Sequence, residues 1–480
     1  MTCIIWHLYI TGAFLPKWIE WKDEAYAYGQ NMDIELKNHK VAVSKKSEAD
    51  GKEAEVIWQS DKGVIVQDCL IADVDRNERD ELVLLTFRRA RYGPHKPFFI
   101  DKNDKSWSQH IDVYAFDDER GNFKPIWMAS DIGIDAKRFR YDNAHNRLII
   151  QDKNDRVSSW IWPGFGFARA EDSVSFAVCG DNLIHDNIYE YGLNKCDGDF
   201  SFLYENISDR LSDFDVRVLN LETTLVDNPN LYGGYPSFGT PVQIGEAAAD
   251  AGFNVFTCAT NHALDRGMTG IDTVAKLCND RNITYLGVQS SAEKEQIPYK
   301  IFWKKGYSFA MFNYTMGLSN TNGKYPEDIP ANAVHLMEDE HEIKANLLEA
   351  RKKADAVIVF VHWGTEDTAT IDDFQRKWAE NFNECGVDVV VGTHPHVIQS
   401  VDLLENDKGQ KTLVYYSLGN LISAQRRDAN LIGGMAEFTM GVTMDGMEIT
   451  DYDLEKTLTV KEKGKYTVQL VGEKIGKMIQ

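Results

Sequence analysis

Residues 387–396 read Val387-Asp-Val-Val-Val-Gly392-Thr-His394-Pro-His396, a valine run that ends in a glycine and two histidines. The consecutive β-branched residues predict a strand that is buried on both faces. Gly392 permits a sharp turn, so we expect His394 and His396 on a loop at the carboxyl edge of a sheet, where α/β folds place their chemistry. Imidazole is the most common metal-ligating side chain. A lone histidine pair is more often structural, so a metal site needs support from other strands.

Other apolar segments end in the same manner, directly before polar residues that ligate metals. These are 174–179 before Gly180-Asp181, 216–219 before Asn220-Leu-Glu222, 254–258 before Thr260-Asn261-His262, 356–361 before His362-Trp-Gly364, and 413–416 before Ser417-Leu-Gly-Asn420. Helices are expected between them, at 244–251, 270–279 and 373–385. Parallel strands would bring these ends together at one edge, and a mixed oxygen and nitrogen set suits Mn²⁺, Fe or Zn²⁺. Each polar residue taken alone, Asp181 or Thr260 for example, can also be a helix cap.

The chain of 480 residues is too long for one hydrophobic core, so two or more domains are expected. Residues 21–168 contain short apolar-aromatic runs separated by turn clusters, and no long helical pattern. This predicts an antiparallel β domain with three blade-like units. Residues 162–167 read as a linker, and strands alternate with helices over 171–480, which is typical of an α/β domain.

An Asp-rich segment at 70–84 resembles the calcium loop of FG-GAP or VCBS-type propeller repeats. Asp73, Asp75 and Asn77 alternate as oxygen ligands do. Arg76 and Arg79 interrupt the pattern, and the usual glycines are missing. The alternative, which we favour, is a turn held by Asx side chains.

The formal net charge of −22 argues against nucleic acid as a partner, because phosphate contacts need a basic surface. The seven cysteines are scattered without CxxC spacing, so neither a disulfide framework nor a structural zinc site is indicated.

Residues 1–20 form a hydrophobic N-terminal segment. Its apolar part, Cys3 to Leu15, is shorter than a membrane span and lacks a basic region or a clear cleavage site. Two interpretations stay open, a remnant of a membrane anchor and a buried first strand. The first places the protein at the cell surface or on the outer side of the membrane. An unanchored, genuine N-terminus would make it cytoplasmic.

The ordered motifs over 172–425 resemble the CapA family, the capsule (poly-γ-glutamate) biosynthesis proteins of the calcineurin-like metallophosphoesterase superfamily. The residues that carry the resemblance are Gly180-Asp181, Asn220-Leu-Glu222, Asn261-His-Ala-Leu-Asp265-Arg-Gly267, His362-Trp-Gly364, Gly392-Thr-His394-Pro-His396 and Ser417-Leu-Gly-Asn420. The resemblance implies a four-layer α/β/β/α sandwich with the site between the inner sheets, preceded here by the all-β, partial-propeller-like domain.

The resemblance also implies residue roles. The expected metal ligands are Asp181, Glu222, Asn261, His362, His394 and His396, with Glu222 in the bridging position. His262 is expected to be the proton donor or transition-state stabiliser, and Asp265 to orient it. Arg266, Arg426 and Arg427 are candidates to bind substrate carboxylates or phosphates, although Arg426 and Arg427 can equally be solvated surface.

The sequence departs from ordinary metallophosphoesterases at Leu183, where their Asp-x-His motif has a histidine. One or two divalent transition metal ions are therefore expected. His185, one helical turn after Asp181, is a further candidate, although a histidine in a solvent-facing helix is more common.

The function implied is a metal-dependent hydrolase that uses metal-activated water on a phosphoester or γ-glutamyl amide bond. The alternative is a non-catalytic, metal-dependent factor that binds the anionic capsule polymer during export or anchoring. A third class, a structural β protein with a degenerate module, fits poorly with so many retained ligand-type residues. The expected partners are an anionic polymer or small-molecule substrate, the capsule-synthesis machinery, and a membrane through the N-terminal segment.

Overall fold

The computed structural model describes residues 15–46, 54–92, 98–102, 106–129, 131–319 and 325–474. The chain splits into two compact units, Met1–Asp172 with Val442–Gly446, and Ser173–Gly441 with Met447–Gln480. The second unit is therefore interrupted by a short turn that belongs to the first, a feature that the sequence did not predict. The N-terminal apolar segment lies largely outside the described residues.

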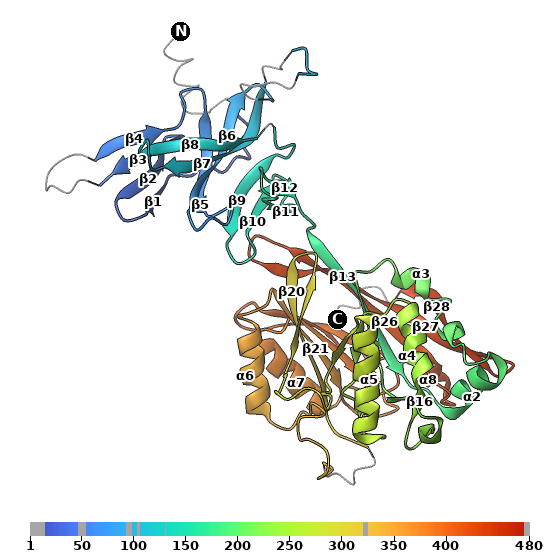
Figure 1. The fold of residues 1–480 in the computed structure, drawn as a ribbon. Coiled ribbons are helices and arrows are strands. Elements are labelled where there is room, and N and C mark those ends of the chain that lie inside the picture. Colours follow the sequence, from blue (N-terminus) through green and yellow to red (C-terminus); the bar gives the residue numbers. More distant parts are fainter. Residues whose placement is uncertain are drawn as a thin grey trace. The chain divides into compact units, whose positions relative to one another are not determined.

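The described part of the first unit contains three four-stranded antiparallel sheets, each built from consecutive strands (Figure 1). The first contains β1 (Glu24–Tyr28), β2 (Met32–Lys37), β3 (Lys40–Lys45) and β4 (Glu55–Gln59). The second contains β5 (Ile65–Ala72), β6 (Glu81–Arg89), β7 (Trp107–Asp117) and β8 (Asn122–Met128). The third contains β9 (Ala136–Asp142), β10 (Arg147–Asp152), β11 (Val157–Ile161) and β12 (Ala168–Arg169). The antiparallel strands agree with the sequence pattern, and a propeller arrangement stays a prediction.

The Asp-rich segment forms the turn between β5 and β6. Asp73 accepts hydrogen bonds from the backbone N–H groups of Asn77 at 3.0 Å and Glu78 at 2.8 Å, and Asn77 Oδ1 accepts one from Arg79 at 2.8 Å. These are Asx-type bonds, as the favoured interpretation expects. Ligand atoms of Asp73, Asp75 and Glu81 also lie within 4.8 Å of one another, so the calcium-loop alternative stays a prediction.

The second unit is a mixed α/β structure with two large sheets among the described residues. The eight-stranded sheet runs β18 (Thr284–Leu286), β17 (Val255–Thr257), β14 (Val216–Asn220), β13 (Ser173–Asn182), β26 (Ile432–Val442), β27 (Met447–Glu462) and β28 (Lys465–Lys474), with β25 (Asn420–Ile422) paired to β13. The six-stranded sheet runs β19 (Lys300–Lys304), β20 (Tyr307–Thr315), β21 (Ala356–His362), β22 (Val389–Thr393), β24 (Lys411–Tyr415) and β23 (Val401–Glu405). A small parallel pair joins β15 (Leu225–Val226) and β16 (Thr240–Pro241).

Parallel pairing runs through the part of each sheet that carries the predicted motifs. It joins β13, β14, β17 and β18 in one sheet and β20, β21, β22 and β24 in the other. The strand pattern taken alone predicted these strand ends at one edge, and the family resemblance implied a site between two sheets. The structure distributes them over two sheets, because β13 and β14 pair with each other while β21 and β22 pair elsewhere.

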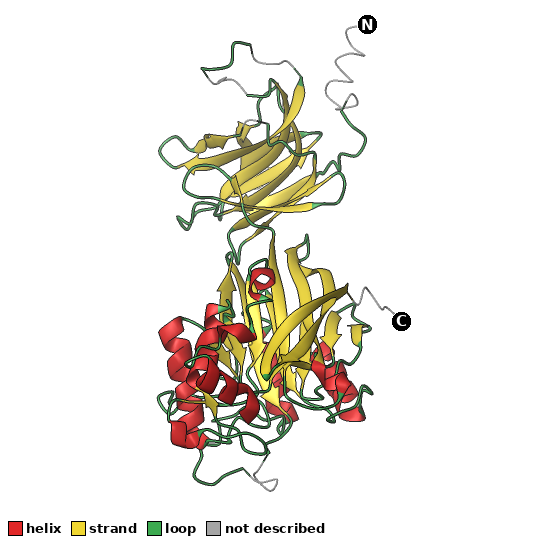
Figure 2. Cartoon of the chain, turned by 90° about the vertical axis from the view of Figure 1, so that its right-hand side faces the viewer, coloured by secondary structure: helices red, strands yellow, loops and turns green. Residues whose placement is uncertain are grey.

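Helices pack on each sheet of the second unit, and Figure 2 shows them on both outer sides of the strands. The helices are α2 (Asp186–Lys195), α3 (Ser208–Leu211), α4 (Val242–Asp250), α5 (Gly267–Arg281), α6 (Glu340–Ala350), α7 (Asp373–Glu384) and α8 (Asp428–Leu431), with single 3₁₀ turns at Ser201–Leu203 and Pro229–Leu231. The α4 and α5 side chains share one core cluster with β14 and β17, and those of α6 and α7 share another with β20 and β21. The count of four layers stays a prediction.

The helix α7 illustrates how local sequence sets an element. Asp372 and Gln375 form a capping box at its start, in which each side chain binds the other's backbone N–H. Gly386 follows its end with φ +79°, as expected for a C′ glycine. Within the described part of the chain, no helix is both long enough and apolar enough to cross a membrane.

Candidate metal centre

Asp181 is fully buried at the end of β13. A Cβ at the preceding Gly180 would lie 2.0 Å from the carbonyl oxygen of Gly419, so only glycine allows this close approach. Asn220 Nδ2 donates to Asp181 Oδ1 at 2.8 Å, and the backbone N–H of His394 donates to Oδ2 at 3.3 Å. The carboxylate therefore receives donors from both sheets.

Glu222 follows β14 and is also fully buried. Neither of its carboxylate oxygens has a hydrogen-bond partner among the described residues. Its Oε1 lies 3.9 Å from His362 Nε2 and 3.8 Å from His396 Nε2. A buried carboxylate without hydrogen bonds is costly unless a cation compensates it.

His394 and His396 follow β22 with φ angles of +99° and +58°. Non-glycine residues rarely adopt positive φ, and such conformations occur preferentially at functional sites. His396 Nδ1 lies 3.0 Å from Asp181 Oδ2 and 3.1 Å from Asn420 Oδ1. The unusual backbone turns the His396 imidazole toward Asp181 and the His394 imidazole toward His362.

His362, the last residue of β21, completes the histidine group. Its Nε2 lies 3.0 Å from Asn261 Oδ1 and 3.2 Å from His394 Nδ1, and its Nδ1 lies 3.0 Å from Thr393 Oγ1. Asn261 is also held by Ser319, whose hydroxyl accepts from its Nδ2 at 3.0 Å. The structure thus brings all six predicted ligand residues into one connected cluster.

Electrostatics in this cluster are dominated by burial and by the two carboxylates. Burial, reinforced by Asp181, raises the pKa of Glu222 well above its usual range. Burial and the neighbouring histidines lower the pKa of His362 well below its usual range, and burial lowers that of His394 to about 3. Burial also opposes the charged form of His396, but Glu222 and Asp181 outweigh it and raise its pKa to about 10.

These residues fit a divalent transition metal. Ligand atoms of Asp181, Glu222 and His396 lie within 4.8 Å of one another and all three residues are buried. His362 and His394, neutral at pH 7, have the form in which imidazole ligates. A cation here would also compensate the orphaned oxygens of Glu222, and the mixed donor set suits Mn²⁺, Fe or Zn²⁺.

His262 lies beside this cluster and makes a different set of contacts. Its Nδ1 lies 2.8 Å from Asp265 Oδ2, and its ring meets that of Phe238 edge-on at 4.7 Å between centroids. Asp265 Oδ2 also accepts the backbone N–H of Phe238 at 2.7 Å. The carboxylate therefore orients both the imidazole and the segment that contains Phe238, which leaves His262 Nε2 for other partners.

Arg266 is engaged with that same segment. Its guanidinium donates to the carbonyl oxygens of Leu231 at 2.7 Å and Ser237 at 2.9 Å, and to Ser237 Oγ at 2.5 Å. This geometry assigns it to holding residues 231–238, and a direct role in binding substrate stays a prediction.

The other arginines lie at the surface. Arg427 pairs with Asp367 at 2.8 Å with 61% of its side chain exposed, and Arg426 is exposed. Their positions fit both interpretations of the sequence, which are binding of substrate and a solvated surface. His185 occupies the position before α2 without a capping hydrogen bond from its side chain. Its ring lies edge-on to Phe238 at 5.5 Å between centroids, so it is not on a solvent-facing helix surface.

Several contributing residues were not predicted. Asn220 and Asn420 bind Asp181 and His396, although both belong to the quoted motifs. Thr393 and Ser319 orient His362 and Asn261. Thr260 is not a helix cap, since its hydroxyl donates to the carbonyl of Glu222 at 2.9 Å and accepts from the N–H of His262. The motif positions of the two asparagines were a usable signal, whereas Ser319 had none.

The family model described as bacterial capsule synthesis protein PGA_cap matches residues 175–425, more than half of the 480 residues. The chain belongs to this capsule synthesis protein family. The matched region contains every residue of the cluster, from Asp181 to Asn420.

Two curated relatives in this capsule synthesis group are similar. The PGA biosynthesis protein CapA of Bacillus subtilis (strain 168) is 32% identical over 190 residues, which are 38% of this chain and 47% of that protein. The capsule biosynthesis protein CapA of Bacillus anthracis is 24% identical over 265 residues, 54% of this chain and 61% of that protein. The chain thus matches less than two thirds of the length of either relative.

Two solved structures align weakly. The protein TT1561 of Thermus thermophilus gives a TM-score of 0.30 at 9% identity and covers 55% of this chain and 93% of that chain. The 5'-nucleotidase from Candida albicans gives 0.31 at 10% identity and covers 58% of this chain and 49% of that chain.

Proposed function

We propose that this protein is a metal-dependent hydrolase that acts on an anionic capsule polymer, on a phosphoester or a γ-glutamyl amide bond. The observation that carries the proposal is the buried carboxylate of Glu222, which lacks hydrogen bonds among the described residues and faces His362 and His396 across 3.9 and 3.8 Å. A buried carboxylate without hydrogen bonds is costly unless a cation compensates it, which supports the role of Glu222 as a metal ligand.

Asp181, Glu222, Asn261, His362, His394 and His396 would hold the ion. A bound divalent cation supplies Lewis-acid polarisation and water activation. The chain itself supplies the proton relay, since Asp265 holds His262 Nδ1 at 2.8 Å and leaves Nε2 to donate to a leaving group. The segment 231–238, held by Arg266 and Asp265, positions Phe238 against the His262 ring.

The substrate class rests on family membership and on the names of the relatives, which refer to capsule and PGA biosynthesis. A polymer of carboxylates needs cations on the protein, and the exposed Arg426 is available near the Ser417-Leu-Gly-Asn420 motif. We further propose that the protein works with the capsule-synthesis machinery at the cell surface, outside the cytoplasm.

A second candidate is a metal-dependent polymer-binding factor without turnover. It is favoured by Leu183, a buried residue where metallophosphoesterases supply a histidine ligand. Binding of polymer carboxylates by the ion would then take the place of hydrolysis.

Metal analysis of the purified protein, combined with turnover assays on poly-γ-glutamate and on a nitrophenyl phosphodiester, tests both candidates. Hydrolysis requires bound metal and measurable turnover on at least one substrate. Metal-dependent polymer binding without turnover would replace the hydrolase with the binding factor. Absence of both metal and polymer binding would contradict both.

The variant His262→Ala tests whether His262 acts as a general acid or as a metal ligand. We expect unchanged metal content and turnover lower by roughly 10²–10⁴-fold, the usual contribution of a general acid. His341→Ala, an exposed histidine on α6, is the matched control and should change neither. A loss of metal in His262→Ala would place His262 among the ligands, and full activity would remove it from the mechanism.

A further inference from the structure

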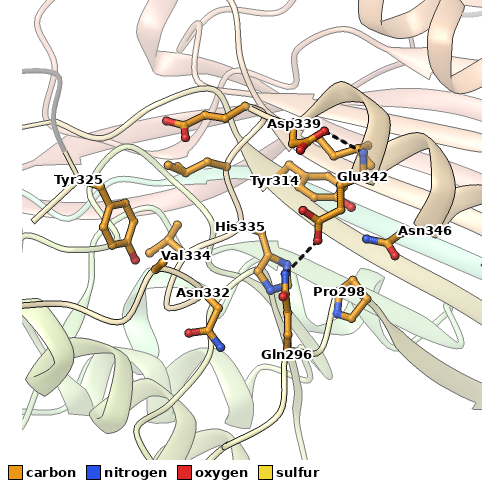
Figure 3. A pocket seen from close by; sticks show the side chains of 14 residues that line it. Gln296, Pro298, Tyr314, Tyr325, Asn332, Val334, His335, Asp339, Glu342 and Asn346 are labelled. Carbon is orange, nitrogen blue, oxygen red and sulfur yellow. Dashed lines mark hydrogen bonds between the residues drawn. The ribbon is translucent and has the colours of Figure 1, made fainter. Parts of the chain in front are cut away.

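A cavity of about 310 Å³ lies apart from the metal centre, between the end of β20, the start of α6 and the segments around Gln296 and Asn332 (Figure 3). It shares no residue with the metal centre. Tyr314 belongs to the core cluster of α6 and α7, so the cavity opens on the helix-covered face of the six-stranded sheet. His362 follows Val361, the strand partner of Tyr314, and therefore lies on the opposite face.

The inner wall contains polar atoms without partners. The hydroxyl of Tyr314, a residue that is 4% exposed, has no hydrogen-bond partner among the described residues. The ring of His335 interacts with the backbone of Asn313 through one nitrogen at most, so at least one of its ring nitrogens is unpaired among these residues as well. A buried polar group left unpaired costs about 1–3 kcal/mol. These atoms are therefore suited to a bound polar ligand.

The cavity is negatively charged. Its described lining includes the carboxylates of Glu338, Asp339 and Glu342, and no lysine or arginine. Burial lowers the pKa of His335 to about 4, so this residue is neutral at pH 7 and adds no positive charge. The positive charge of Lys300 also lowers the pKa of His335. Lys300 itself does not line the cavity, because its ammonium group lies over the ring of Tyr285, 3.4 Å from the centroid.

Aromatic rings and amides complete the lining. Tyr325 donates its hydroxyl to the carbonyl of Pro330 at 2.7 Å, which fixes its ring beside the cavity. Gln296 Nε2 donates to Glu342 Oε1 at 3.2 Å, and Asp339 caps α6 by accepting from the N–H of Glu342. Carboxylates beside aromatic faces attract organic cations through charge and cation–π interaction.

We propose that this cavity binds a small organic cation with a primary ammonium or guanidinium group. The cationic group would lie against Glu342 and Glu338, and the rest of the molecule would reach Tyr314 and His335. The volume is at the lower end of the range of about 300–1,000 Å³ for small-ligand pockets, which limits the ligand to a small molecule. The negative lining excludes the anionic polymer proposed for the metal centre.

Calorimetric titration of the full chain with agmatine, which carries both cationic groups, tests the proposal. We expect one agmatine per chain, weaker binding at high salt, and no binding of uncharged 1,4-butanediol. Binding should persist in the His394→Ala/His396→Ala variant, because the metal centre is not involved. Absence of agmatine binding at millimolar concentration, or equal binding of butanediol, would overturn the proposal.

Two variants locate the site. Glu342→Gln and Tyr314→Phe should each weaken agmatine binding by about tenfold, which corresponds to about 1.4 kcal/mol. Glu349→Gln removes the same charge from α6 outside the cavity and should have no effect. Equal affinity in all three variants would contradict the assignment.

The melting temperature without ligand gives an independent readout. Because the Tyr314 hydroxyl is buried and unpaired among the described residues, Tyr314→Phe should leave the melting temperature unchanged or raise it. The same variant should lose most of the stabilisation that agmatine confers on the unmodified chain. A lower melting temperature without agmatine would show that the hydroxyl has a structural partner, and this would count against the proposal.

Discussion

At the residue scale, the metal centre combines strained backbone with unsatisfied charge. His394 and His396 have φ of +99° and +58°, and Glu222 is buried without hydrogen bonds from the described residues. Each feature lowers the stability of the folded chain, and conformations of this kind cost of order 1–3 kcal/mol each. The positive φ angles and the unpaired carboxylate occur together around Asp181, and a role of the cluster in binding a cation explains this.

Replacement of both His394 and His396 by alanine should abolish binding of transition metal and leave the first unit folded. Both imidazoles are buried and reach His362 and Asp181 at 3.2 and 3.0 Å. Elemental analysis would measure the metal, and circular dichroism the strand content. His341→Ala is the control, and unchanged metal stoichiometry in the double variant would contradict the ligand assignment.

Metal binding should release protons. The pKa of His396 is raised to about 10 and that of Glu222 is raised well above its usual range. The metal-free cluster therefore holds at least one proton at pH 7, which a bound cation must displace. Affinity should rise by about tenfold per pH unit between about pH 6 and 8 for each proton released. Calorimetry in buffers of different ionisation enthalpy measures this number directly, and a pH-independent affinity without proton release would contradict it.

At the element scale, close approach between neighbouring strand ends sets the shape of the site. A Cβ on Gly392 would lie 2.1 Å from the carbonyl oxygen of Tyr416 and 2.4 Å from Trp363 Nε1. Trp363 donates from that nitrogen to the same carbonyl at 2.9 Å, so neither atom can move without loss of the bond. Gly392 lies inside β22 and has no positive φ, so the sharp turn predicted at this position is wrong. The glycine is instead needed for packing between the ends of β21, β22 and β24.

Gly392→Ala should lower the free energy of unfolding by about 1–3 kcal/mol, the usual effect of overpacking. Metal affinity should fall as well, because His394 and His396 follow directly. Denaturant unfolding measures the change. Gly317→Ala is the matched control, since a Cβ there meets no atom within 4 Å among the described residues. Equal stability of Gly392→Ala and the original protein would contradict the packing argument.

At the scale of the whole molecule, the chain contains two compact units, and the metal centre lies within the second. The second unit holds both large sheets and all six predicted ligands. The turn Val442–Gly446 lies between two segments of the second unit in the sequence, but it belongs to the first unit.

Residues 171–480 should express as a soluble, folded fragment that binds metal with the stoichiometry of the full chain. The reason is that its core clusters are built from its own helices and strands. Size-exclusion chromatography and metal analysis check this result. An aggregated fragment would show that the turn at 442–446 needs its partners in the first unit.

The sequence alone predicted the local elements and the candidate ligands. The valine run of β22, the capping box and C′ glycine of α7, and the polar residues after each strand depend on near neighbours in the chain. It also predicted the capsule family, because the motifs occur in a specific order. The long strands β26, β27 and β28 have no counterpart among the strand segments predicted from the sequence.

Only the tertiary structure showed which predicted residues meet and which are used elsewhere. The ligands converge from two sheets. The strand pattern taken alone predicted one edge, because strand partners are set by long-range packing, whereas the family resemblance implied a site between two sheets. Arg266 carries charge suited to a substrate, yet its donors are taken by residues 231–237. Tyr314, His335 and Glu342 form no motif, and the cavity they line exists because β20 and α6 pack side by side. Chemical type is a property of single residues, but position relative to distant residues is decided by the packed core.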